Sequence, residues 1–238
     1  MPKVFVTDRQ IVVPGDPIAE VSDDLQVVGP YVFEAGGIYY SSVMGLASIS
    51  EDKGRIEIIP LEGPYVPKKD DIVIGLVTDI GLTYWEVDIN SPYKAVLNAS
   101  DALNKQFSPM HDDLRRYLTV GDYIVAKVIA FDRTRDPLLT IKGKGLGRVT
   151  KGKVIEVKPS RVPRIIGKRG SMISMLLGET GCNITVGQNG RVWVACQSAE
   201  LEDVLVMAIR KIEREAHTRG LTDKVREFII EERRRRGL

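Results

Sequence analysis

Apolar and polar residues alternate along much of residues 68–144, in short runs separated by glycine, proline or aspartate. A period of two is typical of strands that bury one face. In the clearest run the alternation places Trp85, Val87 and Ile89 on one face and Tyr84 on the other. Five strands are predicted here: residues 71–77, 84–89, 94–98, 123–129 and 138–142. Their number and spacing predict a five-stranded OB barrel whose interior holds the Trp85 face.

Residues 1–67 also carry short β-branched and aromatic runs, which are divided by Gly36-Gly37 and Lys53-Gly54. These runs predict a small β-rich domain. Its strand candidates are residues 4–6, 11–13, 31–33, 38–40 and 56–59. The domain ends at Gly63-Pro64-Tyr65-Val66-Pro67, which predicts a stiff connector because each proline fixes its own φ and disfavours helix before it.

From Lys151 onward the periodicity predicts the order strand, helix, helix, strand, strand, helix. Ser160 is expected to cap the first, short helix, and Ser171 to begin the second, which stops near Gly181. Ser198 is expected to cap the last helix, whose apolar residues recur at helical spacing. The strands are predicted at residues 153–158, 182–186 and 191–196, with the last two joined by the turn Gly187-Gln188-Asn189-Gly190.

Between the two neighbouring helices lies the loop Gly167-Lys168-Arg169-Gly170. Glycine lets a backbone approach a ligand closely, and the amides at the start of the next helix carry partial positive charge. Lys168 and Arg169 add two full charges, which suits a phosphodiester backbone. KH domains use a loop of this G-x-x-G form to clamp about four nucleotides. A bare G-x-x-G is usually only a turn, but its place between two helices and before a hairpin predicts a KH domain of βααββα order.

The predicted fold class is therefore multidomain, mostly β plus α/β. Residues 143–148, Gly-Lys-Gly-Leu-Gly-Arg, resemble a phosphate-binding glycine loop at first sight. They lack the final glycine of a dinucleotide fingerprint and the G-K-[ST] ending of a triphosphate loop, so we interpret them as a domain linker. The predicted parts are a small N-terminal β domain at residues 1–67, the OB barrel at 68–144, the KH domain at 148–220 and a basic tail at 221–238.

The parts differ in charge. Residues 1–67 carry 10 acidic and 4 basic side chains, residues 68–147 carry 11 of each, and residues 148–238 carry 19 basic and 11 acidic ones. Within residues 148–170 Glu156 is the only acidic residue among eight cations. A polyanion is therefore attracted to the C-terminal third and repelled by the N-terminal third. The acidic N-terminal domain is either an ordinary solvated surface or a protein-docking surface.

The candidate RNA-binding side chains follow from the two predicted folds. OB barrels bind single strands on the face of their second and third strands, between flanking loops. Arg133 and Arg135 have an ordinary alternative, because Asp132 and Asp136 stand beside them and can pair with them. The balanced charge of this segment predicts only modest affinity. The candidates are Gly167, Lys168, Arg169, Gly170, Arg161, Arg164 and Lys153 in the KH domain, and Tyr84, Tyr93, Lys127, Arg133 and Arg135 in the barrel.

No catalytic residues, metal site or cofactor are expected. His111-Asp112-Asp113 are better explained as acidic residues that open a helix than as metal ligands. Cys182 and Cys196 are expected to be reduced core thiols, and without a C-x-x-C a structural zinc site is not expected. The sequence has no signal peptide and no apolar run long enough to span a membrane, which predicts a cytoplasmic protein.

Three short segments of the sequence are similar to those of a known family. They are Val13-Pro14-Gly15-Asp16, residues 63–67 followed by Asp71-Ile72-Val73-Ile74-Gly75, and residues 85–89. Together with the domain order, they resemble the RNA-binding cap subunit of the archaeal RNA exosome, in which a small β domain precedes an S1-type OB fold and one KH domain. The resemblance extends to about Ala216. A sister cap subunit that carries a zinc ribbon is excluded by the cysteine count. The chain departs from many S1-type domains at Asn98, where those domains have a stacking histidine.

The resemblance implies a non-catalytic role. Three copies would sit on a hexameric ring of exoribonuclease subunits, bind single-stranded RNA and guide its 3′ end into the ring for degradation or processing. The ring itself would carry out phosphate-dependent cleavage, and the N-terminal domain would dock on it. Residues 221–238, which end in four arginines, would be either a solvated helix end or an extra contact to the RNA backbone.

Two alternatives stay open. The first is a free-standing RNA-binding factor of transcription or translation, because a bacterial elongation factor also joins S1-type and KH domains in this order. That family has two KH copies, whereas one is visible here. The second is a nuclease, which would need clustered carboxylates or an activated base, and neither is apparent in the sequence.

Overall fold

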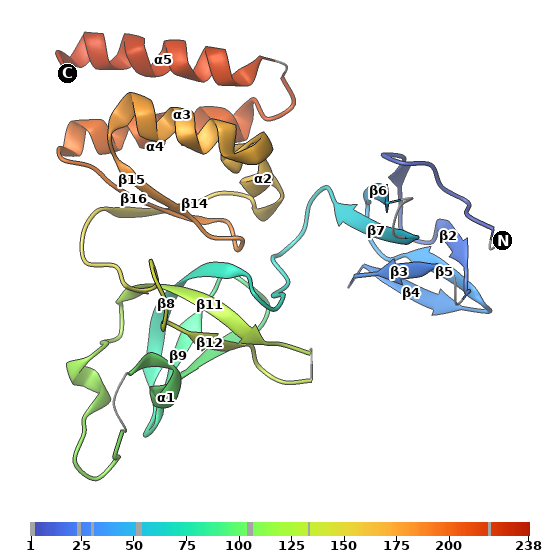
Figure 1. The fold of residues 1–238 in the computed structure, drawn as a ribbon, viewed down its shortest axis with the longest axis horizontal. Coiled ribbons are helices and arrows are strands. Elements are labelled where there is room, and N and C mark those ends of the chain that lie inside the picture. Colours follow the sequence, from blue (N-terminus) through green and yellow to red (C-terminus); the bar gives the residue numbers. More distant parts are fainter. Residues whose placement is uncertain are drawn as a thin grey trace. The chain divides into compact units, whose positions relative to one another are not determined.

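A computed structural model describes residues 3–22, 25–29, 31–50, 54–103, 107–132, 134–218 and 220–238. The chain forms two compact units, Met1–Gly63 and Pro64–Leu238. The second unit contains both the barrel and the KH domain, which contact each other directly (Figure 1). Among the described residues, no helix combines the length and the apolar character that crossing a bilayer requires.

The first unit consists of two small sheets around a core that includes Val12, Ile18, Ile56 and Ile58. The predicted strands at 11–13, 31–33, 38–40 and 56–59 are confirmed, whereas residues 4–6 contribute a single bridge from Val4. One sheet has the order β1 (Ile11–Val12), β6 (Gly45–Ser50), β7 (Arg55–Pro60), β3 (Gln26–Val28), and the other β2 (Pro17–Glu20), β5 (Ile38–Ser41), β4 (Val32–Ala35). The sequence analysis missed β2, β3 and β6, since β2 begins at a proline and β6 is rich in small residues that favour strands weakly.

The barrel confirms the five predicted strands. They are β8 (Ile72–Ile80), β9 (Tyr84–Asp88), β10 (Lys94–Asn98), β11 (Tyr123–Ala130) and β12 (Leu138–Thr140). Their order is β12-β10-β9-β8-β11, and pairing of β11 with β12 closes the ring. Trp85 and Val87 are fully buried, and Trp85 Nε1 donates to the carbonyl oxygen of Leu118 at 3.1 Å. The alternation therefore predicted correctly which side of β9 faces the core.

Two short segments of the barrel test predictions from the sequence: residues 143–148 and the acidic residues before Leu114. Gly147–Arg148 form β13, which pairs with β11, so the interpretation of residues 143–148 as a linker is wrong for these two residues. Asp113 caps η2 (Leu114–Arg116) by accepting a hydrogen bond from Arg115 N at 2.9 Å, as the acidic residues before Leu114 predicted. A single turn, α1 (Ala99–Ala102), follows β10.

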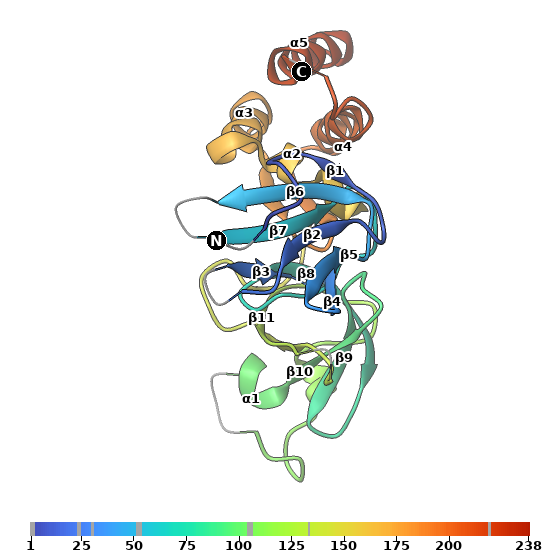
Figure 2. The ribbon, with the colours of Figure 1, turned by 90° about the vertical axis from the view of Figure 1, so that its right-hand side faces the viewer.

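The KH domain has the predicted element order, with its helices on one face of a three-stranded sheet (Figures 1 and 2). The elements are β14 (Lys153–Glu156), η3 (Pro159–Arg161), α2 (Val162–Ile166), η4 (Lys168–Gly170), α3 (Ser171–Thr180), β15 (Asn183–Val186), β16 (Arg191–Ala195) and α4 (Ala199–Arg214). The sheet order is β14-β16-β15. Ser198 caps α4 as predicted, since its side chain accepts from Leu201 N at 3.2 Å. The predicted cap at Ser160 is wrong: the residue lies within η3, and its buried Oγ has no hydrogen-bond partner among the described residues.

Residues 221–238, predicted as a basic tail, form a further helix, α5 (Leu221–Arg236). Leu221, Val225 and Ile229 are buried in the same core as α3 and α4, so α5 extends the KH fold (Figure 2). Arg233 at its basic end donates to the carbonyl oxygen of Glu179 at 2.6 Å. The helix therefore has a buried apolar face, which the low overall hydropathy of this segment concealed.

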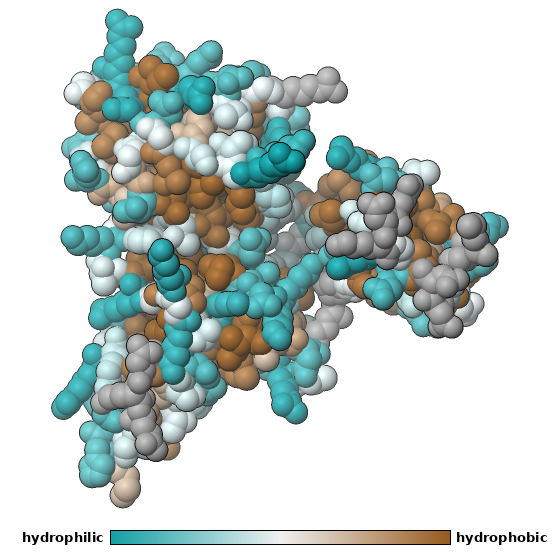
Figure 3. Space-filling model, viewed as in Figure 1, coloured by the Kyte–Doolittle hydropathy of each residue, from teal (hydrophilic) through white to brown (hydrophobic). Residues whose placement is uncertain are grey.

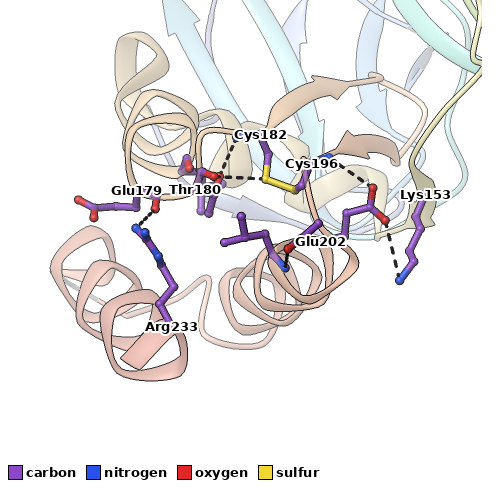
Figure 4. Close-up of a disulfide and its surroundings, with 10 residues drawn as sticks. Lys153, Glu179, Thr180, Cys182, Cys196, Glu202 and Arg233 are labelled. Carbon is purple, nitrogen blue, oxygen red and sulfur yellow. Dashed lines mark hydrogen bonds and ion pairs between the residues drawn. A yellow bond between two sulfur atoms is a disulfide. The ribbon is translucent and has the colours of Figure 1, made fainter. Parts of the chain in front are cut away.

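Cys182 and Cys196 form a disulfide, so the expectation of two reduced thiols is wrong (Figure 4). They lie one position beyond Asn183 and Ala195, the last registered pair of the β15–β16 hairpin. Their Cα atoms are 4.3 Å apart, the spacing of residues directly opposite each other in antiparallel strands. The expectation rested on residue type and compartment and did not use this register. The bond ties the end of α3 to the start of α4.

Candidate nucleic-acid interface

The G-x-x-G loop joins α2 to α3 through a backbone that depends on its glycines. Gly167, Arg169 and Gly170 all have positive φ, of 77°, 53° and 79°. A Cβ on Gly167 would lie 2.6 Å from the backbone nitrogen of Met172. Gly170 N donates to Gly167 O at 3.1 Å. Because Gly167 has no side chain, the loop packs directly against the first turn of α3 and turns its two basic residues outward.

The basic side chains of the loop are available to a ligand. Lys168 and Arg169 are exposed, and within the described ranges neither has an ion-pair partner. Arg164 in α2 is exposed as well, and its guanidinium donates to the carbonyl oxygen of Thr218 at 2.6 Å, which orients it without neutralising its charge. Arg161 is half-buried in η3, directly before α2. We call Arg161, Arg164, Lys168 and Arg169 the loop cations.

Lys153 does not belong to this group. Its ammonium lies 2.8 Å from Asp203 and 4.0 Å from Glu202, near the start of α4 and close to the disulfide (Figure 4). The hydrogen bond to Asp203 raises the pKa of Lys153. Arg164, by contrast, contacts Thr218 beyond the far end of α4, a helix about 24 Å long. The charge of Lys153 is thus compensated, and the side chain lies at the other end of the domain.

On the barrel, Tyr84 lies on the outer face as predicted. It is 42% exposed and pairs in register with Asn98 across β9 and β10. Gly81 approaches the Tyr84 ring so closely that a Cβ there would lie 2.6 Å from it, so the ring covers the β8–β9 turn. Farther along the same face, Glu86 and Lys94 form an ion pair of 2.6 Å that raises the pKa of Lys94. This face offers an aromatic ring and amide groups, but little uncompensated positive charge.

Tyr93 and Arg135 lie near each other at one end of that face. Tyr93 is half-buried, and its ring meets the ring of Phe131 edge-on at a centroid distance of 4.8 Å. Arg135 is exposed in the loop before β12, which runs parallel to β10. The positive charge of Arg135 contributes to the lowered pKa of Asp132, after the larger effect of hydrogen bonds from Thr134. Only part of the Tyr93 ring is therefore open to a base, whereas the Arg135 side chain is open.

Lys127 and Arg133 complete the sequence candidates. Lys127 lies on β11, away from the β9–β10 face, and forms an ion pair of 2.6 Å with Asp70. That contact lowers the pKa of Asp70 and compensates the charge of Lys127. Arg133 lies outside the described residues. Within the described part of the chain, no cluster of three or more His, Cys, Asp or Glu side chains could hold a metal ion.

Sequence reasoning missed two buried polar residues that join the KH domain to the barrel. Asn189 is fully buried and bonds to the barrel backbone, and Arg191 is 4% exposed and pairs with Asp88 of the barrel. Asn189-Gly190 was interpreted only as a tight turn. No local signal distinguishes a turn that docks on another domain from one that faces water.

The comparisons with known proteins agree with this architecture. Three family models match the chain: Exosome RNA binding protein RRP4 N-terminal domain over residues 9–62, RRP4, S1 domain over 64–130, and KH domain over 152–200. The Exosome complex component Rrp4 of Ignisphaera aggregans is 47% identical over 97% of this chain and 93% of its own length. That of Sulfurisphaera tokodaii is 50% identical over 96% and 92%.

A solved crystal structure, provisionally described as an exosome complex RNA-binding protein, is 51% identical. It superposes with a TM-score of 0.70 and covers 73% of this chain and 99% of its own. The matched domains follow one another in the order found in the fold, and the curated relatives are similar over nearly their whole length. The chain therefore belongs to the Rrp4 family of exosome complex components.

Proposed function

We propose that this protein is the RNA-binding cap subunit of an exosome and does not itself cleave RNA. It binds single-stranded RNA and guides the 3′ end into a hexameric ring of exoribonuclease subunits, with three copies on each ring. Membership of the Rrp4 family supports the place in an exosome, since the curated relatives are named as exosome complex components. The positions of the chain's own residues support different roles for the two units: the second unit binds RNA and the first docks on the ring.

The observation that carries the RNA-binding role is the G-x-x-G loop. Lys168 and Arg169 are exposed without ion-pair partners in the described ranges, on a backbone held against α3 by Gly167. Two other cations near this stretch of sequence are compensated: Arg148 pairs with Asp122 at 2.8 Å, and Lys153 with Asp203. Phosphates of a single strand would therefore find their strongest attraction at the loop. The barrel face adds stacking on Tyr84 with little charge.

The outer face of the β1-β6-β7 sheet supports the proposal that the first unit docks on the ring. Ile11 and Ile59 both lie opposite Leu46, so the three side chains form a row across three strands, away from the core. Ile11 is 61% exposed and Ile59 49%, and Met44 beside them is 55% exposed. Figure 3 shows apolar surface on this unit. Contiguous exposed apolar side chains are typical of a surface that another protein covers. We call Ile11, Met44, Leu46 and Ile59 the apolar row.

The double substitution Lys168→Asp with Arg169→Asp tests the RNA-binding role. Both glycines stay, so the loop keeps its backbone, while two positive charges become negative where phosphates would lie. A lost charge-assisted contact is worth about 1.5–3 kcal/mol, so we expect RNA affinity to fall at least roughly tenfold. The measurement is fluorescence anisotropy of a labelled single-stranded RNA at several salt concentrations.

The matched control is Arg115→Asp with Arg116→Asp, which makes the same change of net charge at two exposed positions of η2. If binding depended only on overall charge, both variants would weaken it equally. The proposal requires a much smaller loss in the control. Normal RNA affinity of the Lys168→Asp, Arg169→Asp variant would contradict the assignment of the loop to RNA.

A further inference from the structure

We propose that the junction between α4 and α5 is a second contact for RNA, which binds phosphates of a strand that continues beyond the G-x-x-G loop. The contact residues are Arg214 at the end of α4 and Lys224 near the start of α5, which we call the junction cations. This inference rests on the proposed function and adds a binding site for the same strand. A G-x-x-G loop clamps about four nucleotides, so a longer strand has to pass over one of its neighbouring surfaces.

Arg164 links the loop to the junction. It lies three residues before Gly167 in α2, a distance of roughly one helical turn. Its guanidinium donates at 2.6 Å to the carbonyl oxygen of Thr218, which follows the end of α4. Figure 1 shows α2, the end of α4 and the start of α5 on the same side of the KH domain. The loop cations and the junction cations therefore lie on neighbouring surfaces.

The backbone around the junction cations is fixed by contacts of neighbouring residues. The backbone N–H and the Oγ1 hydroxyl of Thr218 both donate to the carbonyl oxygen of Glu215 at 2.9 Å. The Lys211 ammonium lies 2.6 Å from the Glu215 carboxylate and 5.5 Å from the centre of the Phe228 ring in α5. Lys211 thus connects the two helices through its ion pair and its ring contact. A ligand therefore meets the two helices in a constant arrangement.

Positive charge exceeds negative charge at the junction. The Glu215 carboxylate is the common neighbour of Lys211 and both junction cations. The hydrogen bond from Lys211 lowers the pKa of Glu215 most, and the charges of the three cations lower it further. Arg214 and Lys224 are exposed, and neither forms an ion pair among the residues that the structure describes, Asp223 beside Lys224 included. Two positive charges are therefore available to a ligand here.

A neighbouring arginine on α4 differs from the junction cations. Arg210 lies about one turn before Arg214, but its guanidinium is 3.0 Å from Glu213 and donates to the carbonyl oxygen of Glu156 at 2.6 Å. Its charge is compensated, whereas the junction cations extend the uncompensated charge of the loop cations past Arg164. RNA carries a phosphate on every nucleotide and gains from several such charges in succession. A single small anion would contact only one of them.

The test is Arg214→Gln with Lys224→Gln in the full chain, with two labelled single-stranded RNAs of about 4 and about 12 nucleotides that have no internal pairing. The shorter strand fills the loop alone, so its affinity should stay within about twofold. The longer strand loses two phosphate contacts, so its affinity at low salt should fall by roughly tenfold. For the longer strand only, the slope of log affinity against log salt should become shallower by about 1.4, since each phosphate contributes about 0.7. Fluorescence anisotropy measures both quantities.

The matched control is Arg115→Gln with Arg116→Gln, which removes the same two charges at exposed positions of η2 in the barrel. It should leave both affinities within about twofold and the salt slope unchanged. Urea unfolding establishes that both variants are folded, which we expect because all four side chains are exposed. An equal loss of affinity for the longer strand in the control would overturn the inference, since it would reveal an effect of overall charge alone.

A folded Arg214→Gln, Lys224→Gln variant with wild-type affinity and salt slope for the longer strand would overturn the junction contact and leave the proposed function standing. An equal loss of affinity for both strands would overturn it too, because the effect would then lie at the loop. Equal binding of both strands by the wild type would mean that no contact exists beyond the loop. A wild type that binds neither strand would refute the proposed function itself.

Discussion

Two glycines of the KH domain show how strongly the effect of a glycine-to-alanine substitution depends on the local backbone. Gly167 has φ +77° and no room for a Cβ beside the backbone nitrogen of Met172. Gly178 lies in the last turn of α3, has open space around it and no positive φ. Substitution by alanine should therefore have opposite effects at the two positions, although both residues are glycines on the surface of one domain.

We expect Gly167→Ala to destabilise the KH domain by about 1–3 kcal/mol, because alanine must adopt a strained backbone and push Met172 away. RNA affinity should fall at temperatures where the domain is still folded, since the loop changes shape. Gly178→Ala should instead raise stability by about 0.5–1 kcal/mol. Urea unfolding of both variants measures the two changes, and a neutral Gly167→Ala would contradict the role given to this glycine.

The lysines show the same dependence on surroundings in whether their charge is compensated. Lys127, Lys153 and Lys168 are alike in the sequence, but the first two each form an ion pair and the third lies exposed on the loop. Which carboxylate lies near a lysine depends on strands and helices far apart in the chain, as with Lys153 and Asp203. The sequence therefore identified the loop as a place of exposed positive charge, and it could not show which of the remaining cations are compensated.

Helices and strands with a strong local sequence pattern were predicted correctly, and several with a weak pattern were missed. The alternation around Trp85 predicted a barrel strand and its buried face, and Ser198 predicted the start of α4. The short strands of the first unit were partly missed, because β2 and β6 are held by pairing with distant strands rather than by their own residue preferences. The apolar face of α5 was overlooked because only three of its residues are buried.

The disulfide is the element-scale feature with the largest expected effect on stability. It closes a loop with a sequence separation of 14 residues, for which constraint of the unfolded chain predicts about 3 kcal/mol. We expect the double variant Cys182→Ala, Cys196→Ala to lose about that free energy of unfolding in urea. Reductant should lower the stability of the wild type to a similar level and leave the variant unchanged.

Thiol counting by mass spectrometry establishes that the wild type is reduced in that experiment. If a fully reduced wild type unfolds at the same urea concentration as the oxidised one, the bond does not stabilise the domain. RNA affinity at low temperature should stay unchanged in the variant, because the disulfide lies at the end of α3 opposite to the loop.

For the whole molecule, charge and apolar surface are divided between the two units. The first unit is acidic and carries the apolar row, whereas the second carries the loop cations and the contact between its two domains. The net negative charge of the first unit repels a polyanion, which supports the proposal that the apolar row contacts a protein and not nucleic acid. The sequence indicated this division through its charge distribution. The apolar row could be recognised only from the register of β1, β6 and β7.

The last prediction follows from that division. Ile11→Glu with Ile59→Glu places two charges in the apolar row, where desolvation would oppose contact with another protein. Both side chains are largely exposed, so the unit should stay folded, and RNA affinity should stay within about twofold because the loop is untouched. Co-purification with the exoribonuclease ring subunits should be lost. The matched control is Met110→Glu with Val120→Glu, at positions of the barrel that are 90% and 60% exposed, and it should retain the complex. Retention of the complex by the Ile11→Glu, Ile59→Glu variant would mean that the ring binds a different surface. Loss of the complex in both variants would mean that added negative charge alone prevents assembly.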